Sequence, residues 1–298
     1  MISRKFTIWA CGLLFVFGSC AEDMVKPIEN DKDAPGTVQD VKTESLPGAV
    51  KFTYTLPSDP DLLYVLAKYT NKTGKVMEFR SSFYTNSVTV EGFGDTDTYK
   101  VELYTVDRSE NRSQPQIVEV VPLTPPILSC YESLSMVSDF GGMTFEMDNK
   151  FKSDLAIYVC TPDELGDMVL AETFYSAREE IVYSVRGYDA VPRRFGIFLQ
   201  DKYGNETDTL FTELTPIYER ELDKTKFREM YLQNDSRVDS YDGKMEYVWN
   251  GRISKDGDSG GVGLHTGTGT KDGPAVFTFD LGVLAKLSRF ALWAIQDE

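Results

Sequence analysis

The sequence is poor in the residues that most often carry catalysis and metal binding. It has one histidine and four cysteines among 298 residues. No Cys-x-x-Cys pair and no histidine–cysteine spacing is present, so a transition-metal site is not expected. No glycine-rich phosphate loop follows a predicted strand. The apolar run at residues 6–17 has about 12 residues, whereas a membrane-spanning helix needs about 20. The sequence therefore predicts neither a nucleotide-binding fold nor a transmembrane helix.

Positive charge is scarce as well. The chain carries 31 Lys and Arg residues against 47 Asp and Glu residues, a formal net charge of −16. An acidic chain repels nucleic acid and anionic lipid head groups, so no nucleic-acid partner is expected. Neutral ligands, such as sugars, are compatible with this charge.

One segment resembles a catalytic motif but lacks its partners. Ser259 lies in GDSGG at 257–261, which resembles the nucleophile motif of trypsin-like proteases. A serine nucleophile needs a histidine base that a carboxylate orients. The one histidine, His265, follows in the same loop, whereas trypsin-like enzymes place theirs far upstream. No spacing singles out a carboxylate pair for glycoside hydrolysis either. We therefore predict no catalytic residue, no metal site, no cofactor and no enzymatic activity.

Residues 1–19 have the pattern of a signal peptide. Arg4 and Lys5 precede the short apolar run, which ends in Gly18-Ser19 directly before Cys20. A pair of small residues before a cysteine resembles a bacterial lipobox. The resemblance implies cleavage before Cys20 and acylation of its thiol, and several acyl chains hold a protein firmly to a membrane.

Residues 20–33 predict a flexible tether, because they are polar with few apolar side chains. Glu22 and Asp23 follow Cys20 closely. Acidic residues at this place resemble the surface-export signal of Bacteroidota-type lipoproteins. The resemblance implies a lipid-anchored protein of the outer membrane that is exposed at the cell surface, with membrane lipid as a partner through Cys20.

The remaining chain contains an internal repeat of about 93 residues. GAVKF at 48–52 matches GGMTF at 141–145, so that Phe52 aligns with Phe145. We expect these two rings to be buried equivalents. Further matching segments are DLLYV at 61–65 with DLAIY at 154–158, the Asp-x-x-x-Asn turns at 107–111 and 201–205, and Leu-Thr-Pro at 123–125 and 214–216.

The repeated segments alternate between apolar and polar residues. Val50, Phe52 and Tyr54 share one face of a strand, and the residues between them are polar. This period of two, with turns between the runs, predicts about seven half-buried strands per unit, an all-β immunoglobulin or fibronectin type III-like sandwich. The sequence VDRSEN at 106–111 resembles a turn of the fibronectin type III family. We expect one such sandwich at 34–122 and a second, diverged one at 123–216.

Two features mark the start of the second unit. Pro122 and the Pro125-Pro126 pair predict a short, stiff hinge. Cys130 and Cys160 lie in a chain whose signal peptide leads to a compartment that permits disulfides. Both a disulfide and two free thiols remain open, because bridging requires Cα atoms within about 7 Å.

From residue 217 the pattern changes. Residues 219–230 are charged, with sparse apolar residues at helical spacing. A loop rich in Gly, Ser, Thr and Asp runs from 254 to 274, and strand-like segments follow at 277–282 and 287–290. Together with Asn250-Gly251, this order resembles the first part of a discoidin domain, a galactose-binding-like jelly roll. We therefore expect residues 217–298 to form an incomplete jelly roll that lacks partner strands and does not fold on its own.

Tyr247, Trp249 and Asn250 are the candidate ligand-binding residues of this segment. The two aromatic rings could stack on sugar rings, although aromatic residues at strand starts more often belong to the core. In the discoidin family, the turn that Asn250 matches often has an aspartate and helps to bind calcium. Asn250 replaces that charged ligand, so no metal is assigned.

A lipid anchor, two sandwiches and a discoidin-like end together resemble the surface lipoproteins that Bacteroidota-type bacteria associate with glycan uptake systems. The resemblance implies carbohydrate capture, with a glycan and outer-membrane transporter proteins as partners. The alternative is a structural or adaptor lipoprotein that docks a protein partner and binds no sugar.

Overall fold

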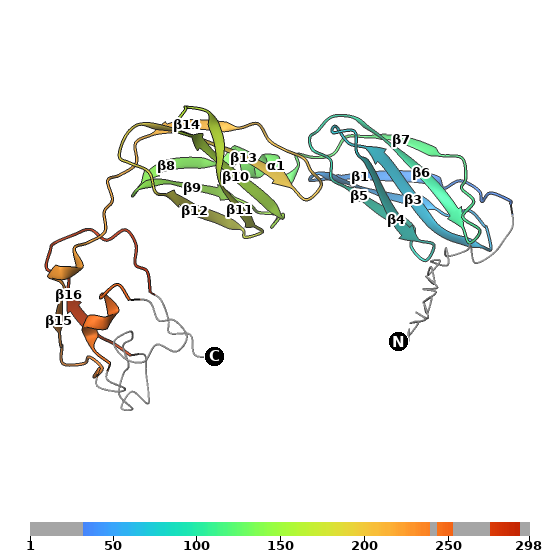
Figure 1. Ribbon diagram of the computed structural model, residues 1–298. Coiled ribbons are helices and arrows are strands. Elements are labelled where there is room, and N and C mark those ends of the chain that lie inside the picture. The colour runs from blue at the N-terminus through green and yellow to red at the C-terminus, as the bar shows by residue number, and fades with distance from the viewer. Residues whose placement is uncertain (1–31, 239–242, 253–274, 293–298) are drawn as a thin grey trace, which may run out of the picture. The chain divides into compact units, whose positions relative to one another are not determined.

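A computed structural model describes residues 32–238, 243–252 and 275–292 (Figure 1). The chain divides into two compact units. The first ends at Leu128 and also includes Tyr203–Asn205, and the second contains the other residues. The fold of the described residues is all-β, because every sheet is antiparallel and α1 is their one α-helix.

The first unit contains a seven-stranded sandwich. One sheet has the order β1-β2-β5 and the other has the order β4-β3-β6-β7. The strands are β1 (Gln39–Leu46), β2 (Ala49–Thr55), β3 (Leu62–Thr70), β4 (Val76–Ser82), β5 (Ser87–Glu91), β6 (Tyr99–Asp107) and β7 (Gln116–Val120).

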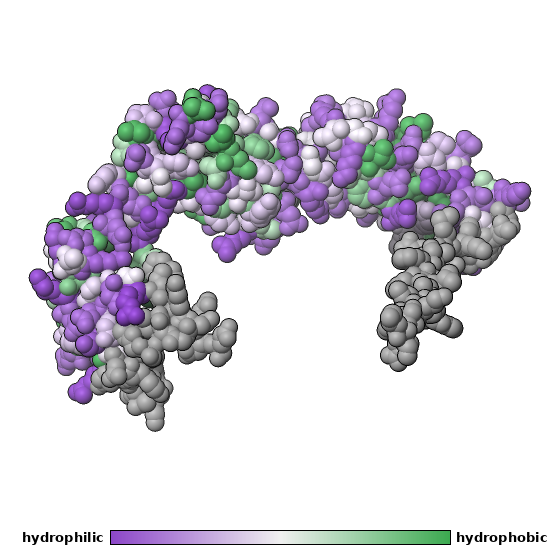
Figure 2. Space-filling model, viewed as in Figure 1, coloured by the Kyte–Doolittle hydropathy of each residue, from purple (hydrophilic) through white to green (hydrophobic). Residues whose placement is uncertain are grey.

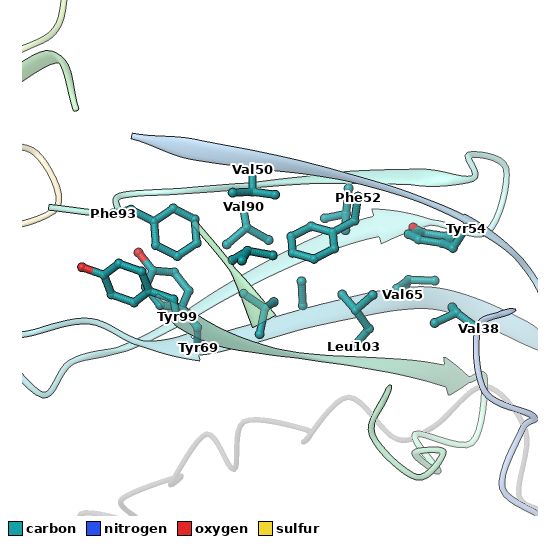
Figure 3. Close-up of a cluster of buried hydrophobic side chains, with 14 residues drawn as sticks. Val38, Val50, Phe52, Tyr54, Val65, Tyr69, Val90, Phe93, Tyr99 and Leu103 are labelled. Carbon is teal, nitrogen blue, oxygen red and sulfur yellow. The ribbon is translucent and has the colours of Figure 1, made fainter. Parts of the chain in front are cut away.

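The core of this sandwich lies between its two sheets (Figure 3). Val50, Phe52 and Tyr54 on β2 are buried, while the polar residues between them are exposed, as the alternation predicts. Figure 3 shows the rings of Phe93, Tyr69 and Tyr99 gathered at one end of the core, and the Tyr69 and Phe93 centroids are 4.4 Å apart. Burial of one large apolar side chain contributes about 1.5–3 kcal/mol, so this interior is the main source of stability.

The second unit contains a sandwich of the same topology. Its sheets have the orders β12-β9-β8 and β11-β10-β13-β14. Its strands are β8 (Ser135–Asp139), β9 (Gly142–Asp148), β10 (Leu155–Pro162), β11 (Met168–Ser176), β12 (Glu180–Arg186), β13 (Arg193–Asp201) and β14 (Leu210–Leu214). Phe52 on β2 and Phe145 on β9 each lie on the central strand of a three-stranded sheet with 0% exposure. The predicted repeat and its buried phenylalanines are confirmed.

The repeat extends to the backbone of the turn before the second strand of each sandwich. Gly48 and Gly141 have φ angles of +62° and +64°, a left-handed conformation that glycine adopts at little cost. The Gly48 N–H donates to the Leu123 carbonyl at 3.0 Å, and the Gly141 N–H donates to the Ile217 carbonyl at 2.7 Å. In each copy, the strand leaving the sandwich is therefore tied to the same turn.

The predicted Asp-x-x-x-Asn turn has the expected bonds in the first copy. The Asp107 Oδ1 atom accepts from the backbone N–H groups of Ser109 and Asn111, both at 2.8 Å. An aspartate side chain that bonds nearby backbone in this way fixes a turn. Beyond each turn, a hydroxyl accepts from a strand N–H: Ser113 from Thr105 at 3.1 Å and Thr207 from Leu199 at 3.0 Å.

The short, stiff hinge expected from Pro122 and Pro125-Pro126 stays a prediction. Pro126 begins the α-helix α1, Pro126–Ser133. Proline is compatible with the first turn of a helix, because its missing N–H has no partner there. Cys130 lies within α1 and is buried, and Cys160 lies on β10. Both thiols are free in this structure, so the open question of a disulfide is answered here by two free cysteines.

The C-terminal segment has little regular structure among its described residues. Its elements are the 3-10 helices η1 (Lys224–Lys226) and η2 (Met245–Val248) and the paired strands β15 (Arg228–Met230) and β16 (Thr278–Asp280). The helical spacing at 219–230 was misleading, because only η1 is helical there. The strand predicted at 287–290 is also absent, since these residues pair with no other described strand. The discoidin-like assignment stays a prediction.

Candidate functional site

Several predicted residues lie outside the described residues. These are the acylation candidate Cys20 and the loop residues Ser259 and His265. The candidates Tyr247, Trp249 and Asn250 are described, and they lie at and just after the 3-10 helix η2 instead of at the start of a strand. A helical turn brings them together, so they do not alternate between two faces of a sheet.

Trp249 takes part in a small aromatic cluster. Its ring centroid lies 5.1 Å from that of Phe279 on β16 and 5.8 Å from that of Phe227, which follows η1. The ring is half-buried. It therefore joins three short elements of the C-terminal segment, which is the packing role that the sequence left open as the alternative to ligand binding.

Tyr247 is half-buried like Trp249, and Asn250 is exposed. The Lys244 Nζ atom lies 5.8 Å from the centroid of the Tyr247 ring. The exposed Asn250 accepts a hydrogen bond from the Arg252 N–H at 2.9 Å, and Gly251 between them has a φ of +77°. This Asn-Gly turn holds the amide at the surface beside η2.

Glu219 links the C-terminal residues to the second sandwich. Its Oε1 atom accepts from the Arg186 guanidinium on β12 at 3.4 Å and from the Ser288 hydroxyl at 2.5 Å, and it forms an ion pair with the Arg289 Nε at 3.2 Å. The Glu219 side chain is only 12% exposed. Two cations and a hydroxyl therefore satisfy this carboxylate, which serves as a structural contact.

Arg186 also bonds a second carboxylate. Its guanidinium donates to Asp139 Oδ2 at 2.9 Å and to the Phe140 carbonyl at 2.9 Å. Burial opposes ionisation of Asp139, but hydrogen bonds from the Phe140 backbone and Thr144, together with Arg186, hold the pKa of that carboxyl below its ordinary value. The cluster thus ties β8 and β12 to the segment around Glu219.

A group of aromatic side chains on the second sandwich was not predicted from the sequence. Tyr158 on β10 and Phe198 on β13 are cross-strand partners with parallel rings 4.7 Å apart. They occupy the outward phase of their strands, since Ile157, Val159 and Ile197 face the core at 0% exposure. In the sequence, these aromatic residues stand at strand positions where the alternation predicts polar residues, and that departure could have indicated the group. Figure 2 shows hydrophobic atoms at the surface of both sandwiches among mostly hydrophilic ones.

The described ranges contain neither a membrane-spanning helix nor a metal-binding cluster. No helix in them is both long and apolar enough to cross a membrane. Within the same ranges, no three His, Cys, Asp or Glu side chains are grouped closely enough to hold a metal ion.

Two family models match consecutive parts of the chain. Residues 35–122 match a domain of unknown function, DUF4959, and residues 123–225 match another, DUF5126. The chain has no significant match among curated proteins.

Among solved structures, a SusE-like protein is 29% identical over 55% of this chain and 57% of its own, with a TM-score of 0.34. The match thus spans little more than half of that protein. A two-domain fibronectin type III segment of chicken tenascin is 12% identical over 60% of this chain and 99% of its own, with a TM-score of 0.29. The fibronectin type III domain of human collagen alpha-1(XX) is 14% identical over 32% and 92%, with a TM-score of 0.28.

Proposed function

We propose that this chain is a lipid-anchored protein of the outer-membrane surface that binds rather than catalyses, and that it captures carbohydrate for a glycan uptake system. The observation that carries the proposal is the order of its parts. A lipobox-like Gly18-Ser19-Cys20 ends the signal peptide, and a polar tether and two sandwiches follow. This order suits a protein that holds a binding segment away from the membrane.

The hydrogen bonds of two buried polar side chains favour a structural role for the sandwiches. Asp107 bonds the backbone of its own turn. Asn149 accepts from the Ser153 N–H and donates to the Ser153 carbonyl, both at 2.9 Å. Buried polar groups that are satisfied within turns stabilise the fold and are not poised for proton transfer.

Tyr247 and Asn250 are the proposed sugar-contacting residues of the C-terminal segment. An aromatic ring offers a flat apolar face, and a neighbouring amide offers donors and an acceptor for hydroxyl groups. Trp249 is proposed to support them, because its contacts with Phe227 and Phe279 hold η2 in place. The proposed protein partner is the outer-membrane transporter that would receive the glycan.

The adaptor function is the second candidate, and one observation favours it. Four apolar side chains near the end of the described residues are 60–102% exposed: Leu284, Leu287, Phe290 and Leu292. Exposed apolar side chains close together often mark a protein interface. In this alternative, the segment docks on a partner protein and binds no sugar.

Acylation is tested by replacing Cys20 with alanine. The C20A variant should incorporate no labelled fatty acid and should leave the membrane fraction, because the thiol is the acylated atom. Cys160→Ala is the matched control and should keep both the label and the membrane location. A C20A variant that stays membrane-bound, together with an unlabelled wild-type protein, would contradict the anchor.

Affinity electrophoresis in gels containing amylopectin, xylan or galactomannan distinguishes the two functions. Retardation of the full chain by one of these neutral polysaccharides, weakened by Tyr247→Ala with Asn250→Ala, supports glycan capture at the C-terminal segment. Tyr231→Ala, also exposed in that segment, is the control. The adaptor function is supported by two results together. No polysaccharide retards the protein, and a transporter co-purifies with the wild type but not with Leu287→Ser and Phe290→Ser.

A further inference from the structure

The outward face of the four-stranded sheet in the second sandwich carries a row of aromatic side chains across its strands. Tyr158 pairs directly with Phe198, and residues that pair directly across an antiparallel sheet share one face. Their rings are nearly parallel, with an angle of 10° between the planes. Tyr175 on β11 and Phe211 on β14 lie on the same face and are 75% and 42% exposed.

The residues beside the stacked pair are small. Thr173 pairs with Tyr158 on the side of β11, and Cys160 pairs with Gly196 one row further along the sheet. Gly196 is buried beneath the Phe211 ring, whose Cε1 atom lies 2.7 Å from the position that a Gly196 Cβ would take, and the Tyr158 and Phe198 rings are half-buried. Arg194 on β13 lies on the same face, with its guanidinium carbon 3.9 Å from the centroid of the Phe211 ring. The face therefore has an uncharged aromatic pair at its centre and a cation on the side of β14.

The first sandwich differs from the second in the row beside the stacked pair. In the equivalent rows of its four-stranded sheet, Lys68 pairs with Glu78 on one side and with Glu102 on the other. These positions correspond to Cys160, Leu170 and Gly196 in the second copy. The positions of Tyr158 and Phe198 themselves carry Leu66, which is fully buried, and Tyr104 in the first copy. The two copies thus differ in the row beside the pair, where one has charges and the other has small or apolar residues.

We propose that the face around Tyr158 and Phe198 is a second binding platform, which takes a neutral glycan chain. This inference rests on the proposed function and adds a site to it. The C–H groups on one side of a sugar ring are weakly positive and pack on the negative face of an aromatic ring. A platform without charged groups at its centre matches a neutral chain, which needs no ionic partner.

Polar groups at the edge of the platform favour a glycan over an apolar protein surface. The Tyr158 hydroxyl donates to Gln200 Oε1 at 3.2 Å, and Gln200 Nε2 donates to Glu206 Oε1 at 2.7 Å. These bonds fix the orientation of oxygen acceptors beside the rings. An apolar partner would remove water from these polar groups at a cost, whereas sugar hydroxyls can donate to their remaining lone pairs.

The test measures the retardation of the full chain by amylopectin, xylan and galactomannan in affinity electrophoresis. Phe198→Ala and Tyr158→Ala should each weaken binding at least tenfold, and Tyr158→Phe, which keeps the ring, should retain most of it. Tyr104→Ala is the matched control, because Tyr104 holds the position of Phe198 on the first sandwich and should leave binding unchanged. Circular dichroism melting identifies any variant that fails to fold.

Cys160 provides a readout that needs no substitution on the platform. Its thiol is free and lies on the same face, so bound polysaccharide should slow its alkylation by a maleimide at least threefold. Cys130 is buried in α1 and serves as the internal control. Full protection of Cys160 by the polysaccharide that retards the protein supports the platform even if Phe198→Ala is unstable.

The outcomes separate this inference from the proposed function. The platform is overturned if folded Phe198→Ala and Tyr158→Ala proteins are still retarded and polysaccharide does not protect Cys160. Glycan capture by the protein would then still stand. No retardation of the wild type by any polysaccharide overturns both. A transporter protein that protects Cys160, while no polysaccharide does so, assigns the face to a protein partner and overturns the platform.

Discussion

The two sandwiches share their strand order, their buried phenylalanines and the hydrogen bonds of their turns, yet they differ on the outward face of the larger sheet. Where the first has the charged residues Lys68, Glu78 and Glu102, the second has Cys160, Leu170 and Gly196. Core and turn positions are constrained by packing and hydrogen bonding, and outward positions are not. Residues that differ between two copies of one fold are therefore where a separate function is best sought.

The comparison of the cores predicts the largest effects. Phe52→Ala and Phe145→Ala each remove a ring with 0% exposure from a central strand. Each should lower the free energy of unfolding by about 3–5 kcal/mol, because the lost burial adds to the cavity left behind. Urea denaturation followed by circular dichroism measures both. A loss under about 1 kcal/mol for one variant would show that the two positions are not energetic equivalents.

Glycine substitutions at the shared turn should give intermediate effects. Gly48→Ala and Gly141→Ala place a side chain at a φ near +60°, which costs about 1–2 kcal/mol. Gly141→Ala should be the worse of the two, because its Cβ would lie 2.6 Å from the Glu219 carboxylate oxygen. Gly74→Ala, at a φ of +82° with nothing within 4 Å, isolates the backbone strain. Equal losses for all three variants would show that the Glu219 contact yields without cost.

The smallest expected effect on stability is that of alkaline pH, and it should differ between the two sandwiches. Burial and a hydrogen bond to Asp95 raise the pKa of Tyr99 to about 12 in the first sandwich. The unfolded phenol has a pKa of about 10, so stability from this group is complete below pH 10 and is lost as pH rises from 10 to 12. The second copy has Arg193 at this position of the repeat.

Urea denaturation at pH 9 and pH 11.5 tests this contrast. Tyr99→Phe should reduce the loss of stability between the two pH values, because its ring no longer titrates. Tyr84→Phe, at an 84% exposed position of the first sandwich, is the control and should not change the loss. A Tyr99→Phe variant as sensitive to alkaline pH as the wild type would assign the effect to other groups.

The sequence was informative where a pattern has a single structural meaning. Alternation at Val50, Phe52 and Tyr54 and the self-bonding Asp107 turn have one physical solution each, and both were predicted. The platform was not predicted, because alternation assigns each residue to one of two faces of a strand. It does not show which outward residues of different strands lie next to one another. Tyr158 and Phe198 are distant in sequence, and the strand register brings them together.

The C-terminal segment was harder to predict for a different reason. Its strands β15 and β16 have three residues each, too short for a period of two to be distinguished from chance. The strand expected at 287–290 requires a neighbouring strand, and sequence alone does not say whether that neighbour exists. The aromatic contacts of Trp249 bridge residues far apart in the chain, so no local pattern pointed to them.

The hydrogen bond between Gly48 and Leu123 has a mechanical consequence. The chain enters the first sandwich where the Thr105 hydroxyl donates to the Gly36 carbonyl, and it leaves beside Leu46, at the far end of β1. Tension on the chain therefore runs along β1 and loads its hydrogen bonds to β2 in parallel. Bonds loaded in this way resist together, whereas bonds pulled from one end open one after another. The domain is thus built to stay folded when its two ends are pulled apart.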